Sequence, residues 1–410
     1  MTGKYFKLAI RNIVLYRRRS FLTGTVMVFS TISLIVAASM GEAFYRQLVN
    51  VGIKTATGHL QIIPEESDFD MMNPMAGDIP VISESNIVEE IITKVPYYKA
   101  HSREILYQML LYDKHDNFFQ GTIIGLEPEK AIKTLPGLKV AEGSTLEKSL
   151  NEGILISPIM KTYFDMKEKD EMYIITGGPL GLMNGVKTNF TGVVEYMPFL
   201  AGRIAYIDIA KARELLGFED SICTTIKVVL KDRKKSEMAA RWLSSEFRRR
   251  GLKLKVMDWR QLGGFYYHIA LIGRFLVFVL LLILSTITGL SVLNTMLMSI
   301  KERTKEIGTI LAMGMHERHV LKLFVFESFT LSVTSSLVGL LLGVGLTKWF
   351  EKNGILHGLA LVLEKQLIPT PELAVVFLSF LWIVISGTLG GYLPARKASK
   401  LDPVVALRYV

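Results

Sequence analysis

Cysteine and charge are both scarce in this chain of 410 residues. Cys223 is the only cysteine, so no internal disulfide can form and a disulfide-stapled fold is excluded. Charged residues make up 21% of the chain and hydrophobic residues 50%, a balance that also excludes disordered and collagen-like classes.

Four long stretches lack every ionisable residue type among Asp, Glu, Lys, Arg and His. A helix of roughly 20 apolar residues crosses a bilayer core about 30 Å thick, and each stretch is long enough. The sequence therefore predicts a membrane protein with four spans, at residues 20–41, 275–300, 328–347 and 373–395.

The absence of charge inside these spans excludes further classes. Proton- and ion-coupled carriers and channels with a charged filter use intramembrane carboxylates, His or Arg. The third and fourth spans instead carry small residues, among them Gly339 and Gly343 in a G-x-x-x-G pattern that allows close helix approach. The pattern fits packing within the chain or against a second subunit.

The net charge of +10 lies on segments that four spans would place on one side of the membrane. Residues 1–19 contain six Lys/Arg and no acid, whereas residues 42–274 carry thirty basic and thirty acidic residues. Because Lys and Arg favour the cytoplasmic side, both termini are expected in the cytoplasm. The basicity then reports topology and not nucleic-acid binding.

The expected order of segments follows from this topology. Cleavage of a signal peptide near Ser39 is the less favoured alternative, because the first apolar stretch is long and continues into a helical pattern. Around the four spans we expect an interfacial helix at 1–19, a large external α+β domain with helical stalk ends at 42–274, a cytoplasmic connector at 301–327, an external loop at 348–372 and a cytoplasmic tail at 396–410.

Two short segments resemble enzyme motifs but lack the residue spacing that those motifs require. The histidines of His316-Glu317-Arg318-His319 are three apart, one residue short of the zinc-protease spacing. In residues 181–188 a valine separates the glycine from the lysine that a phosphate loop needs. We therefore predict no catalytic residues, no metal and no cofactor in this chain.

The connector 301–327 is the distinctive element. Glu302, Arg303, Lys305 and Glu306 predict a charged helical turn that continues the second span, followed by an apolar strip and a compact corner at Gly314. A short amphipathic element on the cytoplasmic side is what a partner would need in order to push on the membrane helices.

Two motifs resemble a known family. ERTKEIGTILAMGM (residues 302–315) resembles the coupling-helix signature of FtsX-like permease subunits of ABC transporters, of the mechanotransmission type. LPARKASKLDPVVALRYV (residues 393–410) resembles the C-terminal signature of the same family, and the order of one span, a large domain and three spans covers the whole chain. LAIRNIVLYRRRSFLT and GHLQI are more similar to the lipoprotein-releasing permeases than to the other branches.

The resemblance implies an inner-membrane permease that pairs with a second permease subunit, the same or homologous, and binds a cytoplasmic ABC ATPase dimer, which holds ATP and Mg. In the lipoprotein-releasing branch a periplasmic carrier takes a lipoprotein or other amphiphilic cargo. The residues implied in coupling to the ATPase are Glu302, Arg303, Glu306, Ile307, Gly308, Ala312, Gly314 and Met315. For cargo access between the first two spans we expect Met40, Phe44, Leu271 and Phe275. A periplasmic hairpin either meets the carrier or is a plain hairpin tip, and its residues are Pro179, Leu180, Leu182 and Met183.

Three functions compete. Lipoprotein release driven by a partner ATPase is the leading hypothesis. Efflux of a macrolide or peptide through a periplasmic adaptor is the second, and a non-transporting FtsX-like regulator of a cell-wall hydrolase is the third. A membrane-tethered enzyme is least favoured, because no catalytic constellation is present.

Overall fold

The computed structural model describes Arg11, Leu15 and residues 17–67, 80–167, 169–177, 183–195, 203–262, 264–353 and 369–408. The chain divides into two compact units. Of the described residues, 17–46, 271–353 and 369–408 belong to the first unit, and those between 47 and 270 belong to the second.

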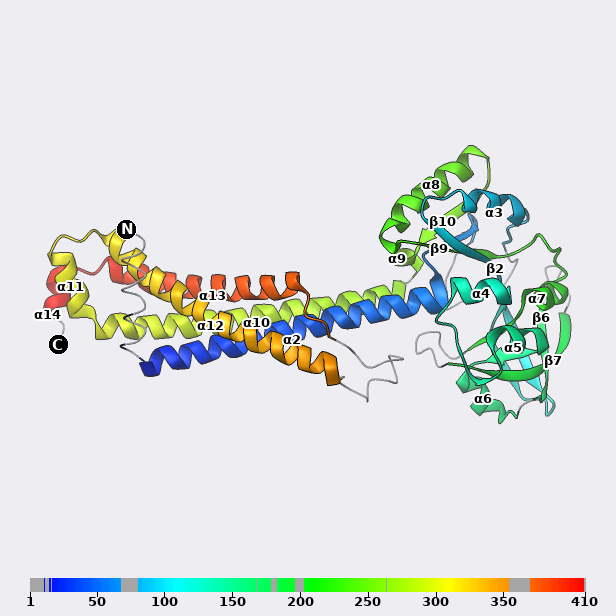
Figure 1. Ribbon diagram of the computed structural model, residues 1–410, viewed down its shortest axis with the longest axis horizontal. Helices are drawn as coiled ribbons and strands as arrows, with labels where there is room; N and C mark the ends of the chain where they lie inside the picture. The colour runs from blue at the N-terminus through cyan, green and yellow to red at the C-terminus, as the bar shows by residue number, and fades with distance from the viewer. Residues whose placement is uncertain are drawn as a thin grey trace. The chain divides into compact units, whose positions relative to one another are not determined.

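Among the described residues, four helices are long and apolar enough to cross a membrane, which confirms the predicted architecture of four spans with an α+β domain between the first and the second. They are α2 (Arg17–Gly52), α10 (Gly264–Glu302), α12 (Glu317–Asn353) and α13 (Leu373–Ser399) (Figure 1). Each extends past its uncharged window, because helical hydrogen bonding continues into the flanking polar residues. Residues 348–353, which we expected in a loop, are therefore helical; residues 354–368 and most of 1–19 lie outside the described residues.

Glycines bring these helices into backbone contact. A Cβ added to Gly339 would lie 2.7 Å from Thr31 Cβ and 2.9 Å from the carbonyl oxygen of Val28, so only glycine lets α12 pack this closely on α2. Gly343 meets Ile35 of α2 in the same way. Of the two possibilities open for the G-x-x-x-G pattern, these two glycines therefore pack within the chain.

The same device joins α13 to its neighbours. Gly387 and Gly391 face Ser332 and Ser328 of α12, and Gly390 lies against the backbone of α10 at Gly289. Hydroxyl pairs connect α2 to α10. Thr23 and Thr295 Oγ1 atoms are 2.5 Å apart, and Thr288 Oγ1 donates to Ser30 Oγ at 3.1 Å.

The second unit is a ten-stranded mixed sheet with helices. Its strands are β1 (Leu60–Pro64), β2 (Tyr98–Asp113), β3 (Phe118–Leu126), β4 (Val140–Gly143), β5 (Ile154–Ile156), β6 (Glu171–Gly177), β7 (Met183–Val194), β8 (Ile204–Asp208), β9 (Thr225–Leu230) and β10 (Leu254–Asp258). Its helical segments, besides the end of α2 and the start of α10, are η1 (Ile53–Thr57), α3 (Ser85–Thr93), α4 (Pro128–Thr134), α5 (Leu146–Glu152), α6 (Pro158–Phe164), α7 (Ile209–Leu216), η2 (Arg233–Lys235), α8 (Ser236–Arg249) and α9 (Trp259–Leu262).

One half of this unit is a β-α-β-β-α-β module. Strands lie in the order β10-β1-β9-β2, and α3 follows β1 as α8 follows β9. The two helices bury Val88, Ile91, Leu243 and Phe247 in one apolar core with the sheet. Because β1 and β10 pair antiparallel, the strands that begin and end the insert are neighbours, and β10 is the edge of the sheet.

The other half is inserted between β2 and β9. The sixteen-residue strand β2 joins the halves, since its first residues pair with β9 and its last with β6. A buried ion pair connects β9 to β2. Lys227 Nζ lies 2.6 Å from Glu104 Oε2, and both side chains are at most 6% exposed. Removing either partner would leave a buried unpaired charge, so this pair fixes the register of β2 against β9.

The glycine contacts generate a prediction. Gly339→Leu should destabilise the helical unit by about 1–3 kcal/mol, because the added side chain overpacks the α2–α12 contact. Gly345→Leu is the matched control, because a Cβ there meets nothing within 4 Å. The melting temperature in detergent measures both, and equal melting temperatures for the two variants would contradict the assignment.

Candidate functional site

The connector between α10 and α12 folds into a short amphipathic helix, α11 (Thr304–Ala312). Its inner face buries Ile307 and Gly308, while Lys305, Glu306 and Thr309 are exposed. Ile307 joins an apolar cluster with residues of α2, α10, α12 and α13, including Met296, Phe324 and Ala395. α11 therefore shares one apolar core with all four long helices.

A second short helix completes this site. α14 (Pro403–Arg408) packs on α11, and Asp402 caps it by accepting a hydrogen bond from the Val404 backbone N–H at 2.8 Å. A Cβ added to Gly308 would lie 2.6 Å from Ala406 Cβ, so a glycine is needed where the helices touch. The two family-like motifs, almost a hundred residues apart in sequence, thus form one surface, which we call the α11–α14 surface.

Arg303 separates α10 from α11, and here the predicted continuation of the second span is wrong. The helix ends at Glu302, and Arg303 has φ −111° and ψ 15°. Its guanidinium is drawn toward α12, where Nη1 lies 3.6 Å from Glu327 Oε2 and the group lies 5.8 Å from the Phe324 ring centre. Glu327 is only 3% exposed, so burial of this ion pair fixes the corner.

Gly314 closes the other end of α11. It has φ +90°, and it donates to the Leu311 carbonyl at 3.0 Å while Met315 donates to the Ile310 carbonyl at 3.2 Å. These two bonds are a Schellman motif, which requires a left-handed residue at this position. The compact corner expected at Gly314 therefore arises from these two backbone hydrogen bonds.

Apolar side chains stay exposed beside this corner. Met313 is 75% exposed and Met315 42%, and α14 adds Val404, Val405 and Leu407. Contiguous exposed apolar side chains with charged neighbours are typical of a docking surface.

The residues predicted for coupling divide into two groups. Glu302, Glu306, Ala312, Gly314 and Met315 are exposed and available to a partner, whereas Ile307 and Gly308 are buried against the chain's own helices. Arg303 is half-buried in its ion pairs. The sequence motif includes both kinds of residue because it encodes the surface and its attachment together.

Glu302 also connects to the first long helix. Arg19 Nη1 lies 3.1 Å from Glu302 Oε2, so α2 and α10 are joined at the ends nearest the α11–α14 surface.

The residues predicted for cargo access lie along the α2–α10 seam. Met40 and Phe44 on α2 are half-buried, and Leu271 and Phe275 on α10 are exposed. A Cβ added to Gly41 would lie 3.9 Å from Val277 Cβ, and one added to Gly273 would lie 3.8 Å from Phe44 Cδ1. The seam is closed at these points.

Charged residues gather beside this seam, a cluster that sequence reasoning missed. Arg274 Nη2 lies 2.9 Å from Glu42 Oε2 and its guanidinium is 3.8 Å from the Tyr45 ring centre. Arg46 Nη1 lies 2.8 Å from Glu372 Oε1, which brings α13 to the same place. Glu42 and Arg274 are the end residues of the predicted insert, a signal that could have suggested their pairing.

At the predicted hairpin, β6 and β7 pair antiparallel from Glu171↔Asn189 to Gly177↔Met183, and contact of this hairpin with a carrier stays a prediction. Met183 is 77% exposed. Pro179, Leu180 and Leu182 lie outside the described residues. Within the described part of the chain, no three His, Cys, Asp or Glu side chains are placed to hold a metal ion.

The buried corner generates a prediction. Arg303→Met should lower the stability of the helical unit by about 1–3 kcal/mol, because the buried Glu327 loses its ion pair with Arg303. Adding Glu327→Gln should recover most of that loss. Melting temperatures of the wild type, both single variants and the double variant form the test, and strictly additive effects would contradict the pairing.

Comparison with known proteins finds similarity to permeases of ABC transporters. The profile of the family described as "FtsX-like permease C-terminal" matches residues 277–403. The chain is 40% identical over 119 residues to the macrolide export ATP-binding/permease protein MacB of Wolinella succinogenes, a match that covers 29% of this chain and 17% of that protein. It is 25% identical over 418 residues to the uncharacterized ABC transporter permease YknZ of Bacillus subtilis, with 98% of each chain covered.

Among solved structures, the periplasmic region of MacB from Actinobacillus actinomycetemcomitans matches 52% of this chain and 94% of that structure, at 15% identity and a TM-score of 0.37. None of these names mentions lipoprotein release, which stays a prediction. The chain carries an FtsX-like permease domain at residues 277–403 and is homologous to ABC transporter permeases of the MacB and YknZ type.

Proposed function

We propose that this chain is the membrane subunit of an ABC transporter that couples ATP hydrolysis by a partner ATPase to motion of the inserted domain. The observation that carries the proposal is the α11–α14 surface, whose outer side is exposed and whose inner side packs into the ends of the long helices. A partner that moves this surface moves α10 directly through the Arg303 corner and α2 through the Arg19–Glu302 pair.

The proposed topology rests on charge. The segments that contain the α11–α14 surface, together with residues 1–19, carry the net positive charge of the chain, whereas the insert is balanced. By the positive-inside rule, the surface and both termini lie in the cytoplasm of a bacterial inner membrane and the insert lies in the periplasm. ATP and Mg then belong to the ATPase, and a second permease subunit is part of the assembly, because four spans without charged residues do not enclose a polar path.

For the cargo we propose an amphiphilic molecule that leaves the membrane between α2 and α10. A lipoprotein passed to a periplasmic carrier is the candidate that the N-terminal motifs favour. Small-molecule export is the candidate that the name of the Wolinella relative favours. Lipoprotein accumulation in the inner membrane of a depleted strain, or restored macrolide resistance in a sensitive one, separates the two; a defect only in cell-wall hydrolysis would instead support the regulator.

The coupling assignment makes one prediction. Glu306→Lys and Gly314→Pro should reduce the amount of co-purified ATPase at least about tenfold, the first by reversing an exposed charge and the second because proline cannot adopt φ +90°. Glu351→Lys, an equal charge change at the opposite end of α12, is the control and should leave co-purification unchanged. Normal ATPase content and transport in both variants would show that the ATPase docks elsewhere.

The proposed cargo path leads to a second prediction. Cysteines introduced at Gly41 and Val277 have the Cβ spacing of a disulfide, 3.9 Å, and oxidation should lock the α2–α10 seam. The native Cys223 will not interfere, because its side chain is fully buried and burial raises the pKa of its thiol to about 12.

Oxidation should stop transport and reduction should restore it, while the Val277→Cys single variant transports equally in both conditions. Undiminished transport by a fully cross-linked protein would rule out cargo access through this seam and would leave the coupling assignment standing.

A further inference from the structure

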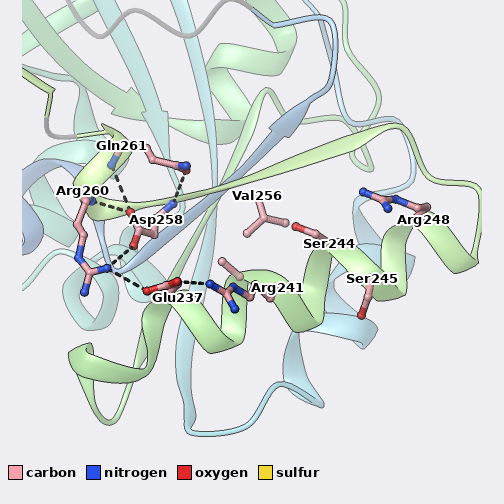
Figure 2. Close-up of a pocket in the computed structure, with 10 residues that line it drawn as sticks. Glu237, Arg241, Ser244, Ser245, Arg248, Val256, Asp258, Arg260 and Gln261 are labelled. Carbon is pink, nitrogen blue, oxygen red and sulfur yellow. Dashed lines mark hydrogen bonds and ion pairs between the residues drawn. The ribbon is translucent and has the colours of Figure 1, made fainter.

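The insert contains a groove that the proposed function does not use. It lies between α8 and the edge strand β10 and has a volume of about 620 Å³ (Figure 2). Val256 of β10 and Ala240 and Ser244 of α8 line it, and arginines stand along its length. A helix beside a sheet edge forms the kind of groove into which an extended peptide can add as a further strand.

The backbone of β10 has hydrogen-bonding groups facing outward. Trp259 donates to the His59 carbonyl and Glu65 donates to the Lys253 carbonyl, which fixes the alternation of the β1–β10 ladder. By that alternation, the N–H and C=O of Val256 point away from β1. No strand in the described part of the chain pairs with β10 on that side.

The polar side chains of the groove define its charge. Arg241 is paired with Glu237, and Arg260 lies 3.3 Å from Glu237 and 3.8 Å from Asp258. Arg248, at the other end of the groove in Figure 2, is exposed and makes no ion pair with any described residue. Three arginines against two acids leave the groove basic, although the insert as a whole is balanced.

We propose that an extended segment of a partner protein binds here by strand addition to β10, with an apolar side chain over Val256 and an acidic side chain at Arg248. Main-chain hydrogen bonds to Val256 supply affinity, and alternate side chains supply specificity, since neighbouring residues of a strand face opposite sides. The occupant is a strand and not a helix, because the free groups are those of a backbone ladder.

The test uses the full chain in detergent without ATP, so that its outcome is independent of the ATPase. The probe is a fluorescein-labelled peptide of alternating glutamate and valine, followed by fluorescence anisotropy. Binding should weaken about tenfold in Arg248→Glu, which reverses the unpaired charge, and in Ser244→Trp, which fills the groove. Arg249→Glu is the matched control, because Arg249 pairs with Glu246 and does not line the groove.

Two further probes separate the alternatives. A peptide with N-methyl groups on alternate residues cannot complete the ladder and should bind at least about tenfold more weakly. Equal binding of that peptide or of a lysine–valine peptide, equal effects of Arg248→Glu and Arg249→Glu, or no binding at all would overturn the proposal. Displacement of the peptide by phosphatidylglycerol vesicles but not by phosphatidylcholine vesicles would also overturn it, because the groove would then be a lipid head-group site.

Discussion

Close backbone contact between helices is the constraint on which the helical unit depends. In a bilayer, apolar side chains gain nothing by leaving lipid for a neighbouring helix, so packing needs shape and short polar contacts. Gly339 and Gly343 supply the contact between α12 and α2, and Gly387 and Gly391 supply the contact between α13 and α12. With α2, α12 and α13 held in this way, the ends of the helices have fixed positions to which a short element can attach.

That attachment holds the α11–α14 surface firmly on the helical unit. An amphipathic helix on a flexible connector could bind a partner but would not transmit force. Here the Arg303–Glu327 pair fixes one end, the left-handed Gly314 fixes the other, and Gly308 allows α14 to lie against the middle. The ion pairs around Glu42 and Arg46 join the same helices beside the insert. Motion at either group of contacts is therefore shared among several helices.

The insert also joins segments that are distant in sequence. Its strands β1 and β10 are neighbours, so displacement of the chain segments that enter and leave it acts on one antiparallel pair. The groove lies on the outer side of that pair, where a bound strand would extend the sheet by one more ladder. Ligand occupancy at β10 and strain in the β1–β10 pair would then affect each other, because both act on the backbone of the same strand through alternate residues.

The sequence by itself determined the spans, the place of the insert and the segment that forms α11, because each depends on a local property: absence of charge, apolar period or a contiguous motif. The apolar face of α8 and the left-handed Gly251 that follows this helix are likewise local features. Only the tertiary structure decided the rest. Strand β10, with five residues, is too short to be recognised alone, and the break at Arg303 depends on Glu327, which is distant in sequence. The union of α11 with α14, and the burial of Ile307 and Gly308 beneath it, arise from contacts across the fold that no local pattern records.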